Sequence, residues 1–193
     1  LIHYSYERSI DNEVSHLIHD VELAYSNTQN NFQTPAKIFL ETVIQKEEIL
    51  QICSKAVNAP PEELKLLHDQ LFMLLSEPYQ KINKRNILQL HFHLPDNRSF
   101  VRFHRPSRFG DDLTDIRPTI KATNETHESQ FGFEVGRFFS GFREVMPLEY
   151  EGKHVGSVEV SFSYQAITEI LQKNSEMIFQ FLINKDVIDK KIF

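Results

Sequence analysis

Arginine is concentrated in one part of this chain. Seven of its nine arginines lie between residues 98 and 143, whereas that window holds only one of the twelve lysines. A guanidinium presents a planar, permanently charged fork that suits carboxylate or phosphate, so this preference for arginine indicates a site for an anionic ligand. The alternative is ion pairing with the acids of the same window, which are Asp111, Asp112, Asp115, Glu125, Glu128 and Glu134.

Three histidines accompany the first of these arginines. His91 and His93 flank Phe92, so on a strand both imidazoles lie on one face, about 7 Å apart. His104 lies in the segment expected to pair with that strand. These side chains could hydrogen-bond a ligand, bind zinc or copper, or sense acidity near neutral pH. Because two histidines in this spacing are common on strands, we expect ligand contacts and no metal site.

Catalytic and nucleotide-binding motifs are missing. Ser140 does not lie in a nucleophile elbow, Gly132 to Gly136 is too short for a dinucleotide loop, and no phosphate-binding P-loop is present. The net charge of −6 argues against a nucleic-acid partner. We therefore expect a binding domain without enzymatic activity or cofactor. Nine of the sixteen phenylalanines lie between residues 92 and 142, where they could form pocket walls or core.

Hydrophobic periodicity predicts helices first and strands later. All six glycines follow residue 109, so the first third is expected to be helical, with helices over 4–31, 34–57 and 60–78. Strands are expected over 87–94, 98–104, 131–137, 142–149 and 154–163, with a short helix over 118–124 and a last helix over 164–193. This order predicts an α+β fold with a five-stranded antiparallel sheet, flanking helices and a PAS-like architecture.

Several of these segments together resemble a known family. The run from Leu90 to Pro106 is similar to the signature of the double-Cache sensor family (the dCache_3 group). The resemblance continues in the segments 109–113 with Arg117, 132–137, 141–148 and 154–159, and it covers about residues 35 to 172. It implies a Cache fold that senses a small ligand, although only one five-strand set is found where a double Cache would have two.

The resemblance also implies the setting of the domain. It would be the periplasmic, membrane-tethered part of an inner-membrane receptor whose output is a chemoreceptor, histidine kinase or diguanylate cyclase module. Residues 1–34 would form a stalk helix that supports a homodimer, 35–172 the sensor domain, and 173–193 a helix returning to the membrane or starting a second unit. The start at Leu1 and the lack of an apolar run of about 18 residues fit a fragment excised from such a receptor.

We expect seven residues to form the ligand site, and the ligand to be anionic or amino-acid-like. The arginines would hold an anionic group, the acid would accept from an amine or orient an arginine, and the histidines would add hydrogen bonds. They are His91, His93, Arg102, His104, Arg117, Glu134 and Arg143. Recognition of a periplasmic protein partner and a histidine-based metal or pH sensor are the alternative functions.

Overall fold

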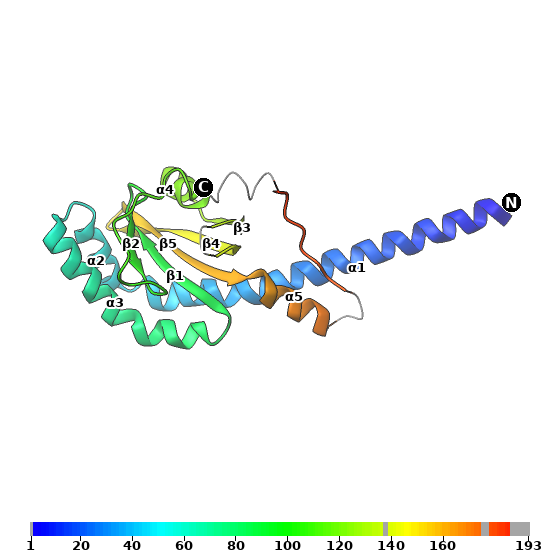
Figure 1. Ribbon diagram of the computed structural model, residues 1–193, viewed down its shortest axis with the longest axis horizontal. Coiled ribbons are helices and arrows are strands. Elements are labelled where there is room, and N and C mark those ends of the chain that lie inside the picture. Colours follow the sequence, from blue (N-terminus) through cyan, green and yellow to red (C-terminus); the bar gives the residue numbers. More distant parts are fainter. Residues whose placement is uncertain (1, 137–138, 175–177, 186–193) are drawn as a thin grey trace.

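The computed structural model describes residues 2–136, 139–174 and 178–185, with side chains from residue 8 onward. It confirms the α+β fold with five antiparallel strands and a long first helix (Figure 1). The elements in chain order are α1 (Ile2–Phe39), the π-helix η1 (Leu40–Ile44), α2 (Glu47–Ala56), α3 (Pro61–Asn83), β1 (Ile87–His93), β2 (Ser99–Arg102), α4 (Pro118–Thr126), β3 (Gln130–Glu134), β4 (Gly141–Tyr150), β5 (Lys153–Ser163) and α5 (Tyr164–Lys173).

The first helix is longer than the sequence predicts. A new helix was expected to begin at Thr34 and Pro35, but α1 continues through both, η1 extends it to Ile44, and the chain turns at Gln45 and Lys46. A proline inside a helix removes one hydrogen bond to the carbonyl four residues earlier. Here Pro35 and Asn31 are both exposed, so water can bind the carbonyl that is left over. The boundary expected at residue 34 therefore lies inside one continuous helix.

The five strands form one sheet in the order β2-β1-β5-β4-β3, with every neighbouring pair antiparallel. Alternate side chains of the central strands point to opposite faces. Leu90 and Phe92 of β1 and Val158 and Val160 of β5 belong to the main hydrophobic core, together with residues of α1, α2 and α3. This helical layer covers one face of the sheet, and α4 lies over the other face (Figure 1).

The sheet face beneath α4 has a different chemistry. Its apolar cluster contains only Leu113, Ile120 and Val145 as buried members. The positions of β1 and β5 on this face are polar, and they include His91, His93 and Glu159, each at most 2% exposed. Because buried polar groups must find partners, this face is where an organised polar site is expected.

The C-terminal region corrects another prediction. The helix expected over 164–193 ends at Lys173, and residues 178–184 are not helical. Phe179 and Phe181 pack against the main core, whereas Ile178 and Leu182 are 84% and 93% exposed. Inward and outward positions thus alternate with the period of an extended chain, although the apolar residues also fit helical spacing. Residues 186–193 of the expected helix lie outside the described residues.

Candidate functional site

A cavity of about 90 Å³ opens on the polar face of the sheet. Since roughly 10–15 Å³ of such space holds one water, it has room for a ligand of several non-hydrogen atoms. Its walls come from β1, β2, β4, the segment between β2 and α4, and the connection between β3 and β4. The lining residues are Gln89, His91, Arg102, His104, Arg105, Arg108, Asp111, Leu113, Ile116, Arg117, Gly136, Phe139 and Arg143.

Strand register brings the first site residues into one row. Arg102 of β2 lies opposite His91 of β1, and His91 lies opposite Glu159 of β5. Residues that are opposite each other in a ladder point to the same face. The row therefore carries a guanidinium, an imidazole and a carboxylate side by side across the three neighbouring strands.

Glu159 is the centre of a buried ion-pair network. One carboxylate oxygen accepts from Nη1 of Arg143 at 2.5 Å, and the other accepts from Nη2 of Arg117. Nε of Arg117 also donates to Glu134 at 2.7 Å. None of these four side chains is more than 10% exposed. Such a network is stable only while each charge keeps its partner.

The pKa values of the network follow from burial and neighbouring charge. Burial raises the pKa of Glu159, but Arg117 and Arg143 bring it far below its ordinary range, so this carboxylate is ionised. Burial lowers the pKa of Arg117, and Glu159 with Glu134 more than offsets that effect, leaving the pKa raised. Burial lowers the pKa of Arg143, and Glu159 offsets only part of it.

Arg102 has its own carboxylate partner at the edge of the cavity. Its two terminal nitrogens donate to the two oxygens of Asp111 at 2.5 and 2.9 Å, which is the bidentate geometry of a strong guanidinium–carboxylate pair. Nη1 also donates to the carbonyl of Arg108 at 2.9 Å. The ion-pairing alternative weighed from the sequence therefore holds for Arg102 with Asp111 and for Arg117 with Glu134, while Arg143 pairs with Glu159 outside the expected window.

The histidines form a compact, uncharged group. The ring centroids of His91 and His93 are 4.1 Å apart, closer than strand rise alone predicts, and those of His91 and His104 are 6.1 Å apart. Burial lowers the pKa of His91 well below its ordinary value, that of His93 to about 3 and that of His104 to about 4. Because these rings are neutral at physiological pH, they argue against the acidity sensor that the sequence left open as an alternative.

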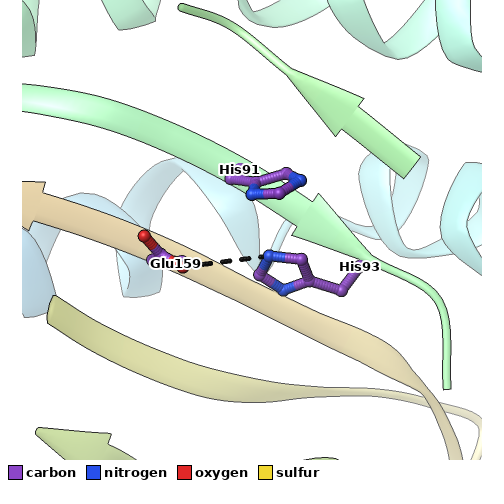
Figure 2. Close-up of side chains that lie close together, drawn as sticks. All are labelled: His91, His93 and Glu159. Atoms are coloured by element: carbon purple, nitrogen blue, oxygen red, sulfur yellow. Dashed lines mark ion pairs between the residues drawn. The ribbon is translucent and has the colours of Figure 1, made fainter. Parts of the chain in front are cut away.

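A metal ion fits this group poorly. Figure 2 shows His91 and His93 side by side on β1, with the Glu159 carboxylate of β5 reaching towards His93. One ligand atom from each of these three residues lies within 4.8 Å of the others. However, both oxygens of Glu159 already accept from the guanidinium cations of Arg117 and Arg143. A metal cation here would be repelled by two fixed positive charges.

Two buried donor or acceptor atoms near the cavity have no hydrogen-bond partner among the described residues. They are Nε of Arg143 and Nδ1 of His104. Both residues line the cavity, and the Arg143 side chain is only 2% exposed. Leaving a buried charged donor without an acceptor costs about 1–3 kcal/mol or more, so these atoms are the places where a ligand would gain most.

The structure brings five of the seven predicted site residues to the cavity wall, and these are His91, Arg102, His104, Arg117 and Arg143. Glu134 and His93 are not among the lining residues. Glu134 accepts a hydrogen bond from Arg117, and Nε2 of His93 lies 3.9 Å from the carboxylate of Glu159. Sequence reasoning missed Glu159, although a signal exists. Ser157, Glu159 and Ser161 alternate with Val158, Val160 and Phe162, which marks a polar face on a buried strand.

Comparison with protein families decides the family of this chain. Residues 25–192 match the dCache_3 model, described as the double sensory domain of two-component sensor kinases. The chain belongs to the double-Cache family. The resemblance drawn from the sequence motifs is thereby confirmed. No curated protein matches the sequence, and no described helix is both long and apolar enough to cross a membrane.

Solved structures of sensory domains share this Cache fold. The sensory domain of the Campylobacter jejuni chemoreceptor Tlp3 with isoleucine bound is 14% identical, with a TM-score of 0.58 over 87% of this chain. The sensor domain of the Vibrio cholerae histidine kinase DctB is 12% identical, with a TM-score of 0.56 over 83% of this chain. The chain spans 64% of the former and 61% of the latter, so these larger structures contain regions beyond the matched part.

Proposed function

We propose that this chain senses a small ligand bound in the cavity on the polar face of the sheet. The observation that carries the proposal is the buried guanidinium of Arg143, which lines the cavity and whose Nε has no acceptor among the described residues. A ligand oxygen would supply that acceptor. Protein cavities that bind small molecules combine apolar walls with a few fixed polar groups, and here Leu113, Ile116 and Phe139 provide the apolar part.

The proposed ligand is a small anionic or amino-acid-like molecule. Arg102, Arg117 and Arg143 would form its anion-binding side, and His91 and His104 would add hydrogen bonds as neutral rings. Glu134 would orient Arg117, and His93 would support Glu159, so these two predicted residues would act without touching the ligand. The Tlp3 sensory domain has been solved with isoleucine and with L-valine, which makes amino acids the first compounds to test.

We further propose that the domain is the extracytoplasmic part of a bacterial transmembrane receptor. The family description names two-component sensor kinases, and the similar folds come from a chemoreceptor and a histidine kinase. The output would be a chemoreceptor, histidine kinase or diguanylate cyclase module. In this arrangement residues 1–34 would serve as the stalk, residues 35–172 as the sensor domain, and residues 173–193 as a helix returning to the membrane or starting a second unit.

A homodimer through α1 is part of this proposal. The helix extends well beyond the sheet and its covering helices (Figure 1). On this part Ile10, Val14 and Leu17 are 42%, 47% and 52% exposed, and Val21 continues the series. Their spacing of four, three and four residues is the a/d pattern of a coiled coil. Packing against the same stripe of a second copy would remove this apolar surface from water.

A thermal-shift screen tests the sensing proposal. Amino acids, mono- and dicarboxylates, amines and nucleobases are added to the wild-type domain, to His104→Gln, and to Arg98→Ala as a matched control, since the Arg98 side chain is 41% exposed and forms an ion pair with Asp96. A ligand at 100 times its Kd adds about 2.7 kcal/mol, which raises the Tm by roughly 5–11 °C in a domain of this size. His104→Gln is expected to reduce the shift and Arg98→Ala to preserve it.

The absence of any thermal shift would overturn the sensing proposal. If no compound raises the Tm of the folded wild-type domain, direct sensing of a small ligand is wrong. Recognition of a periplasmic protein partner then becomes the better proposal.

A further inference from the structure

The three carboxylates that pair with arginines at the cavity, those of Asp111, Glu134 and Glu159, are not equivalent. The carboxylates of Glu134 and Glu159 are 3% and 0% exposed, so neither can leave its arginine without becoming a buried, unpaired charge. The Asp111 side chain is 30% exposed, and it lines the cavity together with its partner Arg102. Asp111 alone among these three acids can therefore exchange its arginine for water or another partner.

The contact between Asp111 and Arg102 has the geometry that a ligand carboxylate would adopt. Both oxygens of Asp111 face both terminal nitrogens of Arg102, at 2.5 and 2.9 Å. The Arg102 side chain is itself 9% exposed, and its Nη1 also donates to the Arg108 carbonyl. The guanidinium of Arg102 is fixed, whereas the carboxylate of Asp111 can move. The same two nitrogens can therefore bind the carboxylate of a ligand in its place.

We propose that Asp111 occupies the position on Arg102 where the carboxylate of the ligand binds, and that the ligand displaces Asp111 on binding. This inference rests on the proposed function, because it describes how Arg102 of the same cavity is kept paired until a carboxylate ligand arrives. Asp111 would then be an internal competitor that sets the affinity of the site.

The neighbourhood of Asp111 provides for its displacement. Its Oδ2 lies 3.9 Å from Nη2 of Arg108, so a small rotation leads from one guanidinium to another. The preceding Gly110 has a φ of +84° and open space around the position of a Cβ atom. Glycine tolerates backbone conformations that other residues avoid, which permits the loop to change shape at this point.

The loop that contains Asp111 also connects the Arg102 site to the helical layer. Phe109 stacks on His68 of α3, with ring centroids 4.3 Å apart and planes at 27°. The same loop is attached to β2 by backbone hydrogen bonds, from Gly110 to Ser99 at 2.7 Å and from Ser99 to Asp111 at 3.0 Å. A displaced Asp111 would shift these contacts, so ligand binding would reach α3 through Phe109.

Calorimetric titration of the whole chain with succinate, pyruvate and L-isoleucine tests this inference. The variants are Asp111→Asn and Asp111→Ala, with Asp112→Asn as the matched control, because Asp112 is exposed and its carboxylate accepts from Thr114. Removing a partly exposed competitor is expected to tighten binding about two- to fivefold. Asp112→Asn is expected to bind like the wild type.

The outcomes separate this inference from the proposed function. If Arg102→Ala abolishes binding but both Asp111 variants bind as the wild type or more weakly, Asp111 is not a competitor and the inference is overturned, while the sensing proposal stands. Weaker binding in the Asp111 variants would instead indicate that the carboxylate holds the ligand's ammonium group. If neither the wild type nor any variant binds any of the three compounds, both the inference and its carboxylate ligand are overturned.

A fluorescent reporter gives an independent reading of the loop. The sequence contains no tryptophan, so Phe109→Trp introduces a single indole against His68. Ligand addition is expected to change its emission, and the change is expected to vanish when Arg102→Ala is added. Binding without any change in emission would contradict the displacement of the loop.

Discussion

Replacing Glu159 by glutamine tests the buried network most directly. The substitution keeps the shape of the side chain and one oxygen acceptor, but it removes the negative charge between Arg117 and Arg143. Glu159 is 0% exposed and the two guanidinium side chains are 10% and 2% exposed, so water cannot replace the lost charge. The positive charges of Arg117 and Arg143 would remain buried and would repel each other without the carboxylate between them.

The magnitude follows from the burial of the pair. Removing one partner of a buried ion pair typically costs about 3–5 kcal/mol of unfolding free energy. In a domain of this length each kcal/mol corresponds to about 2–4 °C, so the Tm of Glu159→Gln is expected to fall by roughly 6–20 °C. Urea unfolding at pH 7, followed by far-ultraviolet circular dichroism, measures the free energy for both proteins.

The pH dependence provides a second check with a defined sign. Because the pKa of Glu159 is lower in the folded protein than its ordinary value, its contribution is fully present above the unfolded pKa of about 4.3. The contribution is lost as the pH falls through the folded pKa. The difference in stability between wild type and Glu159→Gln is therefore expected to narrow below about pH 4.

Glu149→Gln is the matched control, since Glu149 is an exposed residue near the end of β4. An exposed substitution of this kind is expected to change the free energy of unfolding by less than about 0.5 kcal/mol. If Glu159→Gln also costs less than about 1 kcal/mol, the carboxylate does not hold the two arginines, and the description of the site as a charge-balanced network is refuted.

Three further changes test other parts of the structure. Gly156→Ala is expected to destabilise the domain by about 2 kcal/mol or more in the same urea assay, because φ is +127° and a Cβ atom would lie 2.1 Å from the carbonyl oxygen of His93; unchanged stability would contradict this close approach. Burial raises the pKa of Cys53 to about 12, so a thiol reagent at pH 8 should label it only after unfolding, and rapid labelling of the native domain would disprove its burial. Leu17→Glu on the exposed stripe of α1 is expected to convert a dimer into a monomer in sedimentation velocity, whereas Asn12→Glu on the opposite side of the helix should remain dimeric; a wild-type monomer would rule out the proposed interface.

Much of the fold could be predicted because periodicity and turn residues reflect local physics. The alternation from Ile87 to His93 produced a strand close to the observed bounds, and Pro118 marked the start of α4. The errors arose where tertiary contacts override local preference. Pro35 and Pro78 both lie inside helices, and the apolar C-terminal residues pack as an extended chain against the core.

The site was harder to predict, because its pairs join distant segments. Arg117 meets Glu159 across 42 positions of sequence, a contact created only by placing β5 beside β1 and α4 over the sheet. The sequence revealed that arginines gather in one region, but not which of them already have carboxylate partners. Strand register decides that question, and register depends on the packing of the whole sheet.

The unbroken passage of α1 through Pro35 has a mechanical consequence. A helix rises about 1.5 Å per residue, so Arg8 lies roughly 46 Å along the axis from Phe39. A rigid rod of that length works as a lever, in which each degree of tilt at the sheet carries the far end sideways by about 0.8 Å. A tilt of α1 that is too small to alter the core would thus move its N-terminal end by a distance as large as an atomic radius.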